Sequence, residues 1–238
     1  MIGTTVPIHD LTQADIERMH ALLDAHFEGV SHEQFERDLS DKSAAVLLRD
    51  REGVLRGFST LDAYRSTVTT EPLGVVCSGD TIVEPSCRGS AALARTWIHA
   101  ARSMTAELAC ARSVWLLICS GFRTYRFLPV FWREFTPKAS GAPATDAFLL
   151  RKLAAERYGP AFDPSTGIVR LSQPQRLRED AAEIPAGRES DPDVRHFLRL
   201  NPGHAAGDEL ACLCDLRDEN LTPAGRRMVF GAAMECAR

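Results

Sequence analysis

The segment Ser113–Cys119, with the sequence SVWLLIC, is short and almost entirely apolar. A run of this kind is typical of a strand that is buried on both faces of a sheet. Ser120 and Gly121 break the run directly after it. Before it, the alanine-rich segment 91–108 carries apolar residues at helical spacing. The pattern therefore predicts a helix and a central strand that pack together in a layered fold.

The rest of the chain continues the alternation of strands and helices. A linker rich in Pro, Gly and Ala at 137–144 separates a regular first part from a more irregular second part. The whole pattern predicts a mixed α/β sheet, which the strands of the second part complete. Strands are expected over 4–8, 44–48, 55–64, 74–83, 113–119, 167–171 and 209–216, and helices over 13–27, from 31 onward, and over 91–108, 124–135, 144–158, 194–200 and 223–236.

Composition excludes several classes of protein. Of the 238 residues, 45% are hydrophobic and 25% are charged, which is the average of globular domains and unlike disordered or fibrous chains. The net charge of −4 argues against a surface that binds nucleic acid throughout. No segment approaches the ~20 apolar residues that span a bilayer, and the N-terminus lacks the pattern of a signal peptide. We therefore expect a cytoplasmic protein without a membrane partner.

The seven cysteines indicate neither a disulfide framework nor a metal site. No CxxC motif occurs, and the Cys212–Cys214 pair lies in an apolar run without nearby ligands at metal-binding spacing. The cysteines are interpreted as reduced, and no metal is expected. Cys119 could form a covalent thioester, but no histidine lies near it in the sequence, which favours a structural role.

The stretch Val83–Ser90 links a predicted strand to the alanine-rich helix. The N-terminus of a helix offers unpaired N–H groups and a partial positive charge, both of which bind phosphate groups. Arg88 adds a charged donor at this position. A plain connection between a strand and a helix, with an exposed arginine, would have the same local sequence, so the surrounding elements must decide between the two.

The order of those elements resembles the GNAT family of N-acyltransferases over about residues 4–137. In that family, a segment V-x-P-x-x-R-G-x-G-x-G/A at this place cradles the pyrophosphate of acyl-CoA. Val83, Pro85, Arg88 and Gly89 match the segment here. The resemblance implies a GNAT-like fold with an elaborated C-terminal half, and acetyl-CoA or another acyl-CoA as co-substrate.

The match is incomplete, because Ala91 and Leu93 replace the second and third glycines of the segment. Glycine lets a backbone approach phosphate closely, so the loop is expected to be tighter or redirected. A helix start still binds phosphate through its N–H groups, which keeps acyl-CoA as the expected donor. The resemblance implies that the donor contacts Thr81, Ile82, Val83, Arg88, Gly89, Ser90, Ala91 and Ala92.

The resemblance also implies direct attack of an amine on the acyl carbonyl in a ternary complex. A bulge at Gly79 could free a backbone N–H that polarises the carbonyl. Asp80 is the nearest carboxylate and the candidate base. The family's usual acid is a tyrosine, but its position falls on Trp132, so Tyr125 is the candidate substitute. Ser120 could hydrogen-bond the thioester sulfur or CoA.

Each of these residues also has an ordinary structural interpretation. Asp80 could stabilise the bulge, Tyr125 could be a packed aromatic residue, and Ser120 could cap a helix. The polar loop Asn201–Glu209 is either an ordinary connection or a substrate-facing loop that lines the acceptor cleft.

The first functional interpretation is an enzyme that transfers an acyl group from acyl-CoA to the amine of a small molecule. Residues 1–137 are expected to form the donor-binding core, and residues 138–238 to complete the sheet and cover the acceptor site. An enzymatic alternative takes the acyl group from an acyl carrier protein or an aminoacyl-tRNA, which Arg123, Arg126 and Arg133 could contact. A non-enzymatic alternative binds an acyl ligand without turnover. The acceptor, the acyl group and the oligomeric state stay open, and a dimer is compatible with the sequence.

Overall fold

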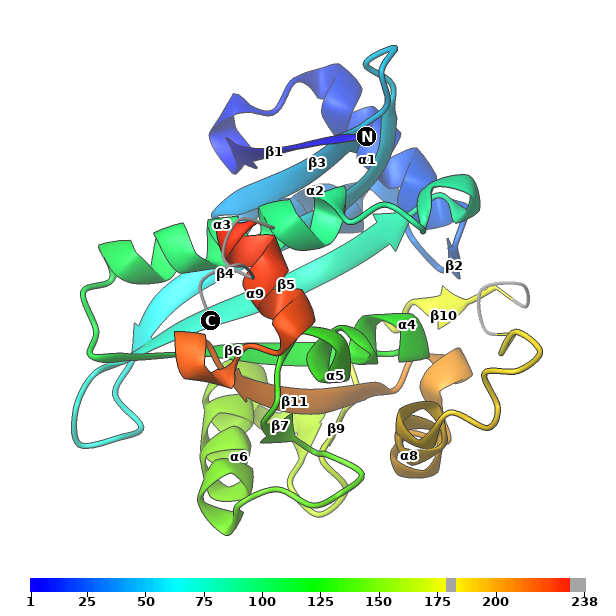
Figure 1. Cartoon of the computed structure of the whole chain (residues 1–238). Helices are drawn as coiled ribbons and strands as arrows, with labels where there is room; N and C mark the ends of the chain where they lie inside the picture. Colours follow the sequence, from blue (N-terminus) through cyan, green and yellow to red (C-terminus); the bar gives the residue numbers. More distant parts are fainter. Residues whose placement is uncertain (179–182, 232–238) are drawn as a thin grey trace.

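A computed structural model describes residues 1–178 and 183–231 of the chain (Figure 1). Within these ranges, one mixed sheet has the strand order β1-β3-β4-β5-β6-β11-β9-β8, and β7 also pairs with β11. The predicted mixed α/β class is therefore confirmed. The strands of this sheet are β1 (Ile2–Pro7), β3 (Ala44–Arg49), β4 (Leu55–Ser66), β5 (Leu73–Val83), β6 (Arg112–Cys119), β7 (Phe135–Thr136), β8 (Phe162–Asp163), β9 (Ile168–Val169) and β11 (Glu209–Asp215).

Strands β5 and β6 form a parallel pair at the centre of the sheet, and α3 (Ala92–Glu107) connects them. The other described pairs of the sheet are antiparallel. Strand β11 lies against β6, with Leu210 opposite Cys119 and Asp215 opposite Val114. The two parts of the chain on either side of the 137–144 linker thus build one sheet.

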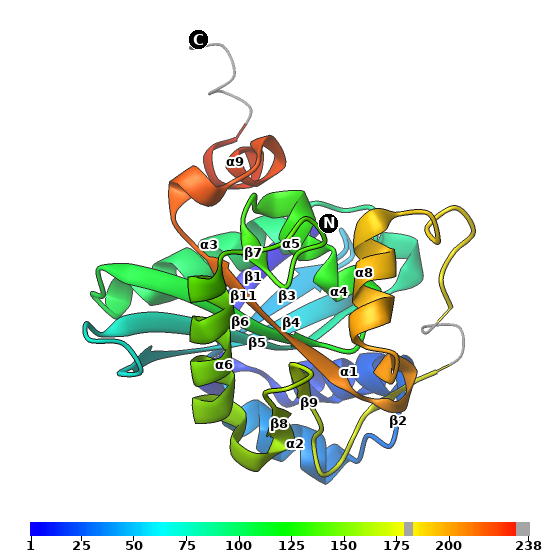
Figure 2. The same ribbon diagram turned by 90° about the horizontal axis from the view of Figure 1, so that it is seen from below.

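Helices cover both faces of the sheet. One face packs against α3, α4 (Phe122–Tyr125), α5 (Phe127–Phe131), α8 (Pro192–Leu200) and α9 (Pro223–Phe230). The opposite face packs against α1 (Gln13–Asp24), α2 (His32–Ser40) and α6 (Ala144–Tyr158). Figure 2 shows α1 and α2 on the side of the sheet away from α5 and α9. Helices on both faces explain why β6 is apolar on both of its sides.

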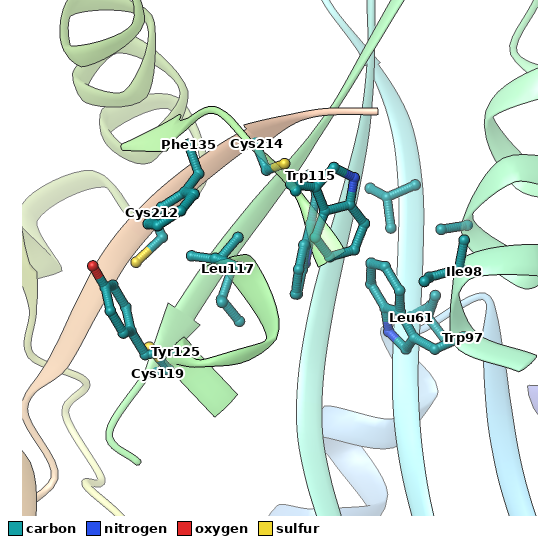
Figure 3. Close-up of a cluster of buried hydrophobic side chains, with 14 of the residues drawn as sticks. Leu61, Trp97, Ile98, Trp115, Leu117, Cys119, Tyr125, Phe135, Cys212 and Cys214 are labelled. Atoms are coloured by element: carbon teal, nitrogen blue, oxygen red, sulfur yellow. The ribbon is translucent and has the colours of Figure 1, made fainter. Parts of the chain in front are cut away.

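A cluster of aromatic residues holds α3 against the central strands (Figure 3). The ring centroids of Trp97 in α3 and Trp115 in β6 lie 4.3 Å apart. Trp132 packs against Trp115 at 5.2 Å and is 2% exposed. Large aromatic side chains bury much apolar area each, so this contact fixes the crossover that carries the chain from β5 to β6.

The predicted helix over 124–135 is wrong in form. Two short helices, α4 and α5, take its place, and the backbone is extended at Trp132. Pro129 lies inside α5 and has no N–H to donate. Trp132 leaves the helix to reach the aromatic cluster and pairs with Leu221 in an isolated bridge. Tertiary packing of the aromatic side chain thus decides where this helix ends.

Other predicted elements are present with shifted ends. The strand expected at 167–171 is reduced to β9, and the C-terminal helix begins as expected after the cap residue Thr222, whose side chain accepts a hydrogen bond from Gly225. Residues 232–236 of that predicted helix, Cys236 included, lie outside the described ranges.

No helix within those ranges has both the length and the apolar character needed to cross a bilayer.

A short pairing that has no signal in the sequence lies beside the site. Strand β2 (Phe27–Glu28) pairs with β10 (Arg176–Leu177) in a separate two-stranded sheet. Two residues are too few to show a period, which explains why neither strand was expected. The pairing ties the segment after α1 to the second part of the chain.

Candidate functional site

Strands β5 and β6 separate before β5 ends. Their parallel pairing runs from Leu73 to Ser78 on β5 and from Arg112 to Leu117 on β6. Strand β5 then continues to Val83, paired with β4 along one edge. Along its other edge, residues 81–83 line a cavity of about 860 Å³. This volume falls within the range of pockets that hold small molecules and cofactors.

The cavity reaches from one face of the sheet to the other. On the α3 face, its walls come from the loop after β5, the start of α3 and helices α4 and α5. On the opposite face, they come from α2, the end of α6 and the start of β11. The segment around β10 adds Gln175 and Leu177 beside Phe27 of β2. Both parts of the chain therefore contribute to one site.

The predicted bulge at Gly79 is confirmed by the pairing of β5 with β4. Ser59 lies opposite Thr81, but Leu61 lies opposite Ser78, so the register shifts between them. A Cβ atom on Gly79 would lie 2.4 Å from Oγ1 of Thr60, which requires glycine at this close approach. Beyond the bulge, Ile82 packs against α1 and α2. Asp80, two residues earlier, lies on the same face.

Asp80 lines the cavity, as expected for a candidate base. Burial raises the pKa of its carboxyl to about 6, the nearby ammonium of Lys42 opposes this shift, and the negative charge of Asp38 adds to it. A carboxylate with this pKa is ionised at neutral pH and still basic enough to accept a proton. The geometry and the electrostatics both fit the role that the sequence suggested.

Glu209 is a cavity residue that was not among the candidates. It is the first residue of β11 and lies in the Asn201–Glu209 loop region, for which a substrate-facing position was one of two interpretations. Burial, and then the negative charge of Asp80, raises the pKa of Glu209 to about 8. The polar loop was the available signal, but only the sheet order brings its last residue to the cavity that β5 also lines.

Arg88 extends along the cavity at the loop after β5. Its Nε donates to the carbonyl oxygen of Val83 at 3.4 Å, and its Nη2 lies 3.3 Å from Nε2 of His26. Nδ1 of His26 lies 2.8 Å from the carbonyl oxygen of Leu22 and donates to it, so Nε2 accepts from Arg88. The guanidinium therefore has a fixed place at the cavity rim and keeps further donors for a ligand.

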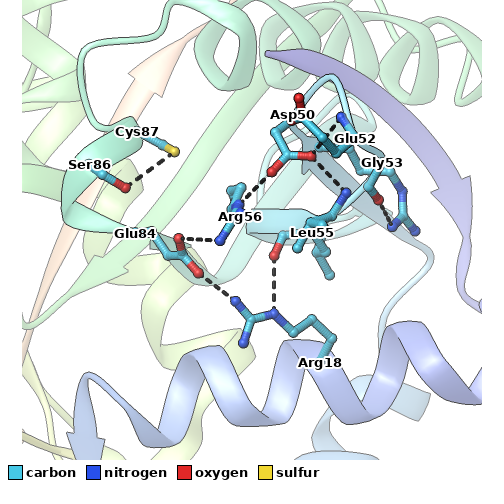
Figure 4. Close-up of polar contacts among 11 residues, drawn as sticks. Arg18, Asp50, Glu52, Gly53, Leu55, Arg56, Glu84, Ser86 and Cys87 are labelled. Carbon is cyan, nitrogen blue, oxygen red and sulfur yellow. Dashed lines mark hydrogen bonds and ion pairs between the residues drawn. The ribbon is translucent and has the colours of Figure 1, made fainter.

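Ion pairs hold the start of this loop (Figure 4). Glu84 lies directly after β5 and accepts from Arg18 of α1 at 2.5 Å and from Arg56 of β4 at 3.2 Å. Arg56 also donates to Asp50 at 2.7 Å. A single turn of 3₁₀-helix over Pro85–Cys87 follows and leads toward α3. The network attaches the candidate phosphate-binding loop to two neighbouring elements.

The structure gathers most of the expected donor-binding residues along the cavity. Thr81, Ile82, Val83, Arg88, Gly89, Ser90 and Ala91 line it, whereas Ala92 does not. The Oγ of Ser90 accepts a hydrogen bond from the backbone N–H of Ala92 at 3.2 Å and thereby uses one N–H of the helix start. Leu93 is 4% exposed and packs in the core while it also borders the cavity.

Tyr125 does not reach the cavity, so the expectation that it acts as an acid is not supported. Its side chain is fully buried between Phe135 and Phe197, and its hydroxyl donates to the carbonyl oxygen of Pro137 at 2.8 Å. Burial also raises the pKa of Tyr125. The short helix α4 turns this position toward the core, as in the structural interpretation. Ser120, in contrast, lines the cavity and is 7% exposed.

The cysteines near the cavity are arranged for packing. Cys119 borders the cavity but is 3% exposed, and burial raises the pKa of its thiol well above the ordinary value. A protonated thiol is a poor nucleophile. Cys212 and Cys214 are buried in the core of β11. In the described ranges, no three His, Cys, Asp or Glu side chains are grouped so that they could hold a metal ion.

Arginines of the proposed carrier or tRNA contact do not form one free patch. Arg123 and Arg126 line the cavity, and Arg133 does not. Nε of Arg126 lies 3.1 Å from a carboxylate oxygen of Asp191. Arg126 is therefore already engaged in an internal ion pair.

No protein-family model and no curated protein sequence matches the chain. Solved structures do resemble it. A probable N-acyltransferase from Enterococcus faecalis, described as a conserved protein of unknown function, matches with a TM-score of 0.41 and 15% identity over 57% of this chain. The match spans 33% of that protein, about a third of its length.

Two further structures have similar scores. A GNAT-family N-acetyltransferase from Escherichia coli, solved in complex with CoA, has a TM-score of 0.38 and 18% identity, over 53% of this chain and 68% of that one. An aminoglycoside 6'-N-acetyltransferase from Acinetobacter haemolyticus has a TM-score of 0.36 and 14% identity, over 46% and 76%. At these identities and TM-scores, the likenesses do not reveal a reaction.

Proposed function

We propose that this chain is a GNAT-type N-acyltransferase that moves an acetyl or other acyl group from acyl-CoA to the amine of a small molecule. One observation carries the proposal: parallel strands β5 and β6 separate and open onto a cavity that extends from the start of α3 to Asp80. Such a fork offers a free backbone edge to an extended donor and a carboxylate to an amine in the same space.

The donor half of the cavity fits an extended, amide-containing molecule with a phosphate end. Residues 81–83 pair with β4 on one edge and line the cavity on the other, so their free edge can hydrogen-bond amides as a strand would. Arg88 and the start of α3 supply donors for phosphate oxygens. Acyl-CoA has these parts in this order, and supplies the activated thioester when it binds.

The chemistry requires one base and one proton for the leaving group. The amine nitrogen forms a bond to the acyl carbon while the bond from carbon to sulfur breaks. An acceptor that arrives as an ammonium first gives a proton to Asp80, whose carboxylate is ionised at neutral pH and lines the cavity, and this frees the lone pair that attacks. The nitrogen loses its second proton as the bond from carbon to sulfur breaks, and the departing thiolate takes a proton from solvent or through the hydroxyl of Ser120, which borders the same space. Nothing in these steps calls for a metal.

The second part of the chain supplies the acceptor side. Glu209 of β11 and Tyr158 at the end of α6 line the cavity on the face that Asp80 shares. We therefore assign to residues 138–238 the completion of the sheet and of the acceptor pocket. Elements of this chain wall the cavity around Asp80, Glu209 and Tyr158, which supports a free small molecule as the acceptor.

Tyr125, the candidate acid, is held in the core and does not reach the cavity, which favours one alternative, a module that binds acyl-CoA without turnover. Incubation of the full chain with acetyl-CoA and a panel of primary amines separates the two. The enzyme releases free thiol only when an amine is present, and mass spectrometry finds the matching amide. CoA binding without amine-dependent thiol release across the panel would identify the binding module instead.

A further inference from the structure

The acceptor half of the cavity, which Asp80, Glu209 and Tyr158 line, contains two carboxyl groups from different strands. Asp80 comes from β5 and Glu209 from β11, and these strands flank β6 (Figure 1). The negative charge of Asp80 contributes to the raised pKa of Glu209. Strand order, and not sequence proximity, brings the two groups together.

Neither carboxyl forms an ion pair with a described residue, although nearby acidic residues do. Asp208, next to Glu209 in the chain, pairs with Arg170 at 3.1 Å. Arg157, a cation that lines the cavity, is already paired with Asp62 at 3.0 Å. A carboxyl withdrawn from water is costly to ionise unless a cation compensates for it. Arginines therefore compensate for the charges of Asp62 and Asp208, whereas Asp80 and Glu209 form no ion pair among the described residues.

The titratable groups that interact with Glu209 in the described part of the chain add no positive charge. Cys119 from β6 and Tyr158 from α6 are its titratable neighbours besides Asp80, and neither carries a positive charge in any protonation state. Among the cavity cations, Arg157 beside Tyr158 is paired with Asp62, and Lys42 acts on Asp80 together with Asp38 of opposite sign. The acceptor half therefore keeps an excess of negative charge when Asp80 and Glu209 are ionised.

We propose that Glu209 and Asp80 together bind the ammonium group of the acceptor, and that the acceptor is an alkylamine cation without a carboxylate close to its nitrogen. The proposal rests on the proposed function, since it names the substrate class of that same site. The negative charge of the site would repel a carboxylate close to the nitrogen of the acceptor. An alkylamine cation without such a carboxylate is only attracted, because it compensates for the two carboxyl groups. Glu209 is then a specificity-determining residue that the second part of the chain contributes.

A proton leaves the site when the ammonium binds. Burial keeps Glu209 largely protonated at neutral pH, and a cation beside it favours the ionised form. Binding therefore becomes tighter as pH rises from 6 to 8, with release of a proton to the buffer, as linkage requires. A carboxyl that served only to stabilise the fold would show no such coupling.

Calorimetric titration of the full chain tests this without any acyl donor. The probes are n-butylammonium, the zwitterion 4-aminobutyrate and the neutral n-butanol, each at pH 6, 7 and 8 in buffers of different ionisation enthalpy. We expect n-butylammonium to bind at least tenfold more tightly than either of the other two, with proton release at pH 7. No binding of n-butylammonium at 100 mM, or equal binding of 4-aminobutyrate, overturns the proposal.

Two variants sharpen the result. Glu209→Gln is expected to lose the proton release and about tenfold in affinity for n-butylammonium, and Glu209→Asp to keep the release. Glu219→Gln, an exposed position away from the cavity, is the matched control. Unchanged affinity and proton release in Glu209→Gln overturn the proposal. Thiol release is measured separately, so that amine binding without turnover rejects the acyltransferase while it retains the amine site.

Discussion

The hydroxyl of Tyr125 donates a hydrogen bond to the carbonyl oxygen of Pro137 across 2.8 Å. This contact directs the ring into the core between Phe135 and Phe197, away from the cavity. It links α4 to the segment after β7, and so helps to hold the short helices that follow β6. Tyr125, the candidate substitute for the tyrosine acid of the family, is therefore held in the core and does not line the cavity.

Tyr125→Phe is expected to lower stability and leave catalysis intact. The change leaves the Pro137 carbonyl without its partner, which costs about 1–2 kcal/mol in the free energy of unfolding. Urea denaturation measures this loss, and kcat stays within about twofold of the wild-type value because no cavity group changes. Tyr64→Phe is the control, since the described hydrogen bond of that hydroxyl is a long one, 3.4 Å to Glu156. A large fall in kcat for Tyr125→Phe would restore the acid role.

Asp80→Asn is expected to lower kcat by about ten- to a thousandfold, the usual contribution of a general base. In the wild-type protein, kcat/KM should rise with pH through about 6, because Asp80 must be ionised to accept a proton and its pKa is raised to about 6. The variant should lose this rise. Asp10→Asn, at an exposed position, serves as the control. A variant that retains both the rate and the pH profile would show that Asp80 is not the base.

Glu209→Gln is expected to stabilise the protein at alkaline pH. The pKa of Glu209 is about 8 in the fold against an ordinary value of 4.5, so the folded state binds more protons between these values. The stability of the wild type therefore falls as pH rises above 4.5, and the loss is complete above 8. Glutamine cannot ionise, so the variant's Tm should exceed the wild-type Tm at pH 8.5, with a difference that shrinks toward pH 5.

Thermal unfolding at pH 5, 7 and 8.5 measures this difference. The Glu219→Gln control should follow the wild type at each pH. A difference in Tm between Glu209→Gln and the wild type that does not change with pH would mean that Glu209 is not held protonated in the fold.

Glu84→Gln is expected to weaken the donor site without touching the chemistry. The carboxylate holds Arg18 and Arg56 at the entrance of the loop that leads to Arg88. Loss of its charge from this half-buried network corresponds to about 1 kcal/mol, or about a fivefold rise in KM for acyl-CoA with kcat nearly unchanged. Glu52→Gln, whose side chain is exposed in the nearby turn, is the control. An equal fall in kcat would place Glu84 in the reaction itself.

Local signals in the sequence were enough to predict the central part of the fold. The apolar run of β6 and the helical spacing of α3 depend on neighbours in the chain, and both elements are present. The break at Gly79 predicted the bulge, because glycine at a close backbone approach leaves a mark in the sequence. Asp80 followed from that bulge.

The rest of the site depends on contacts that the sequence does not show. Glu209 reaches the cavity only because β11 inserts beside β6, and Tyr125 leaves it because Trp132 and the core draw the α4–α5 segment inward. The two-residue pairing of β2 with β10 is also fixed by tertiary packing. Periodicity predicts which residues form an element, but not which edge of the sheet that element joins.

The most direct test of the account is a calorimetric titration of the full chain with CoA, repeated with Arg88→Leu. The account predicts saturable binding at one site, and an affinity for the variant that is about tenfold lower, the effect of one charge-assisted hydrogen bond. Absence of binding at millimolar CoA would contradict the assignment of the fork between β5 and β6 as an acyl-CoA site.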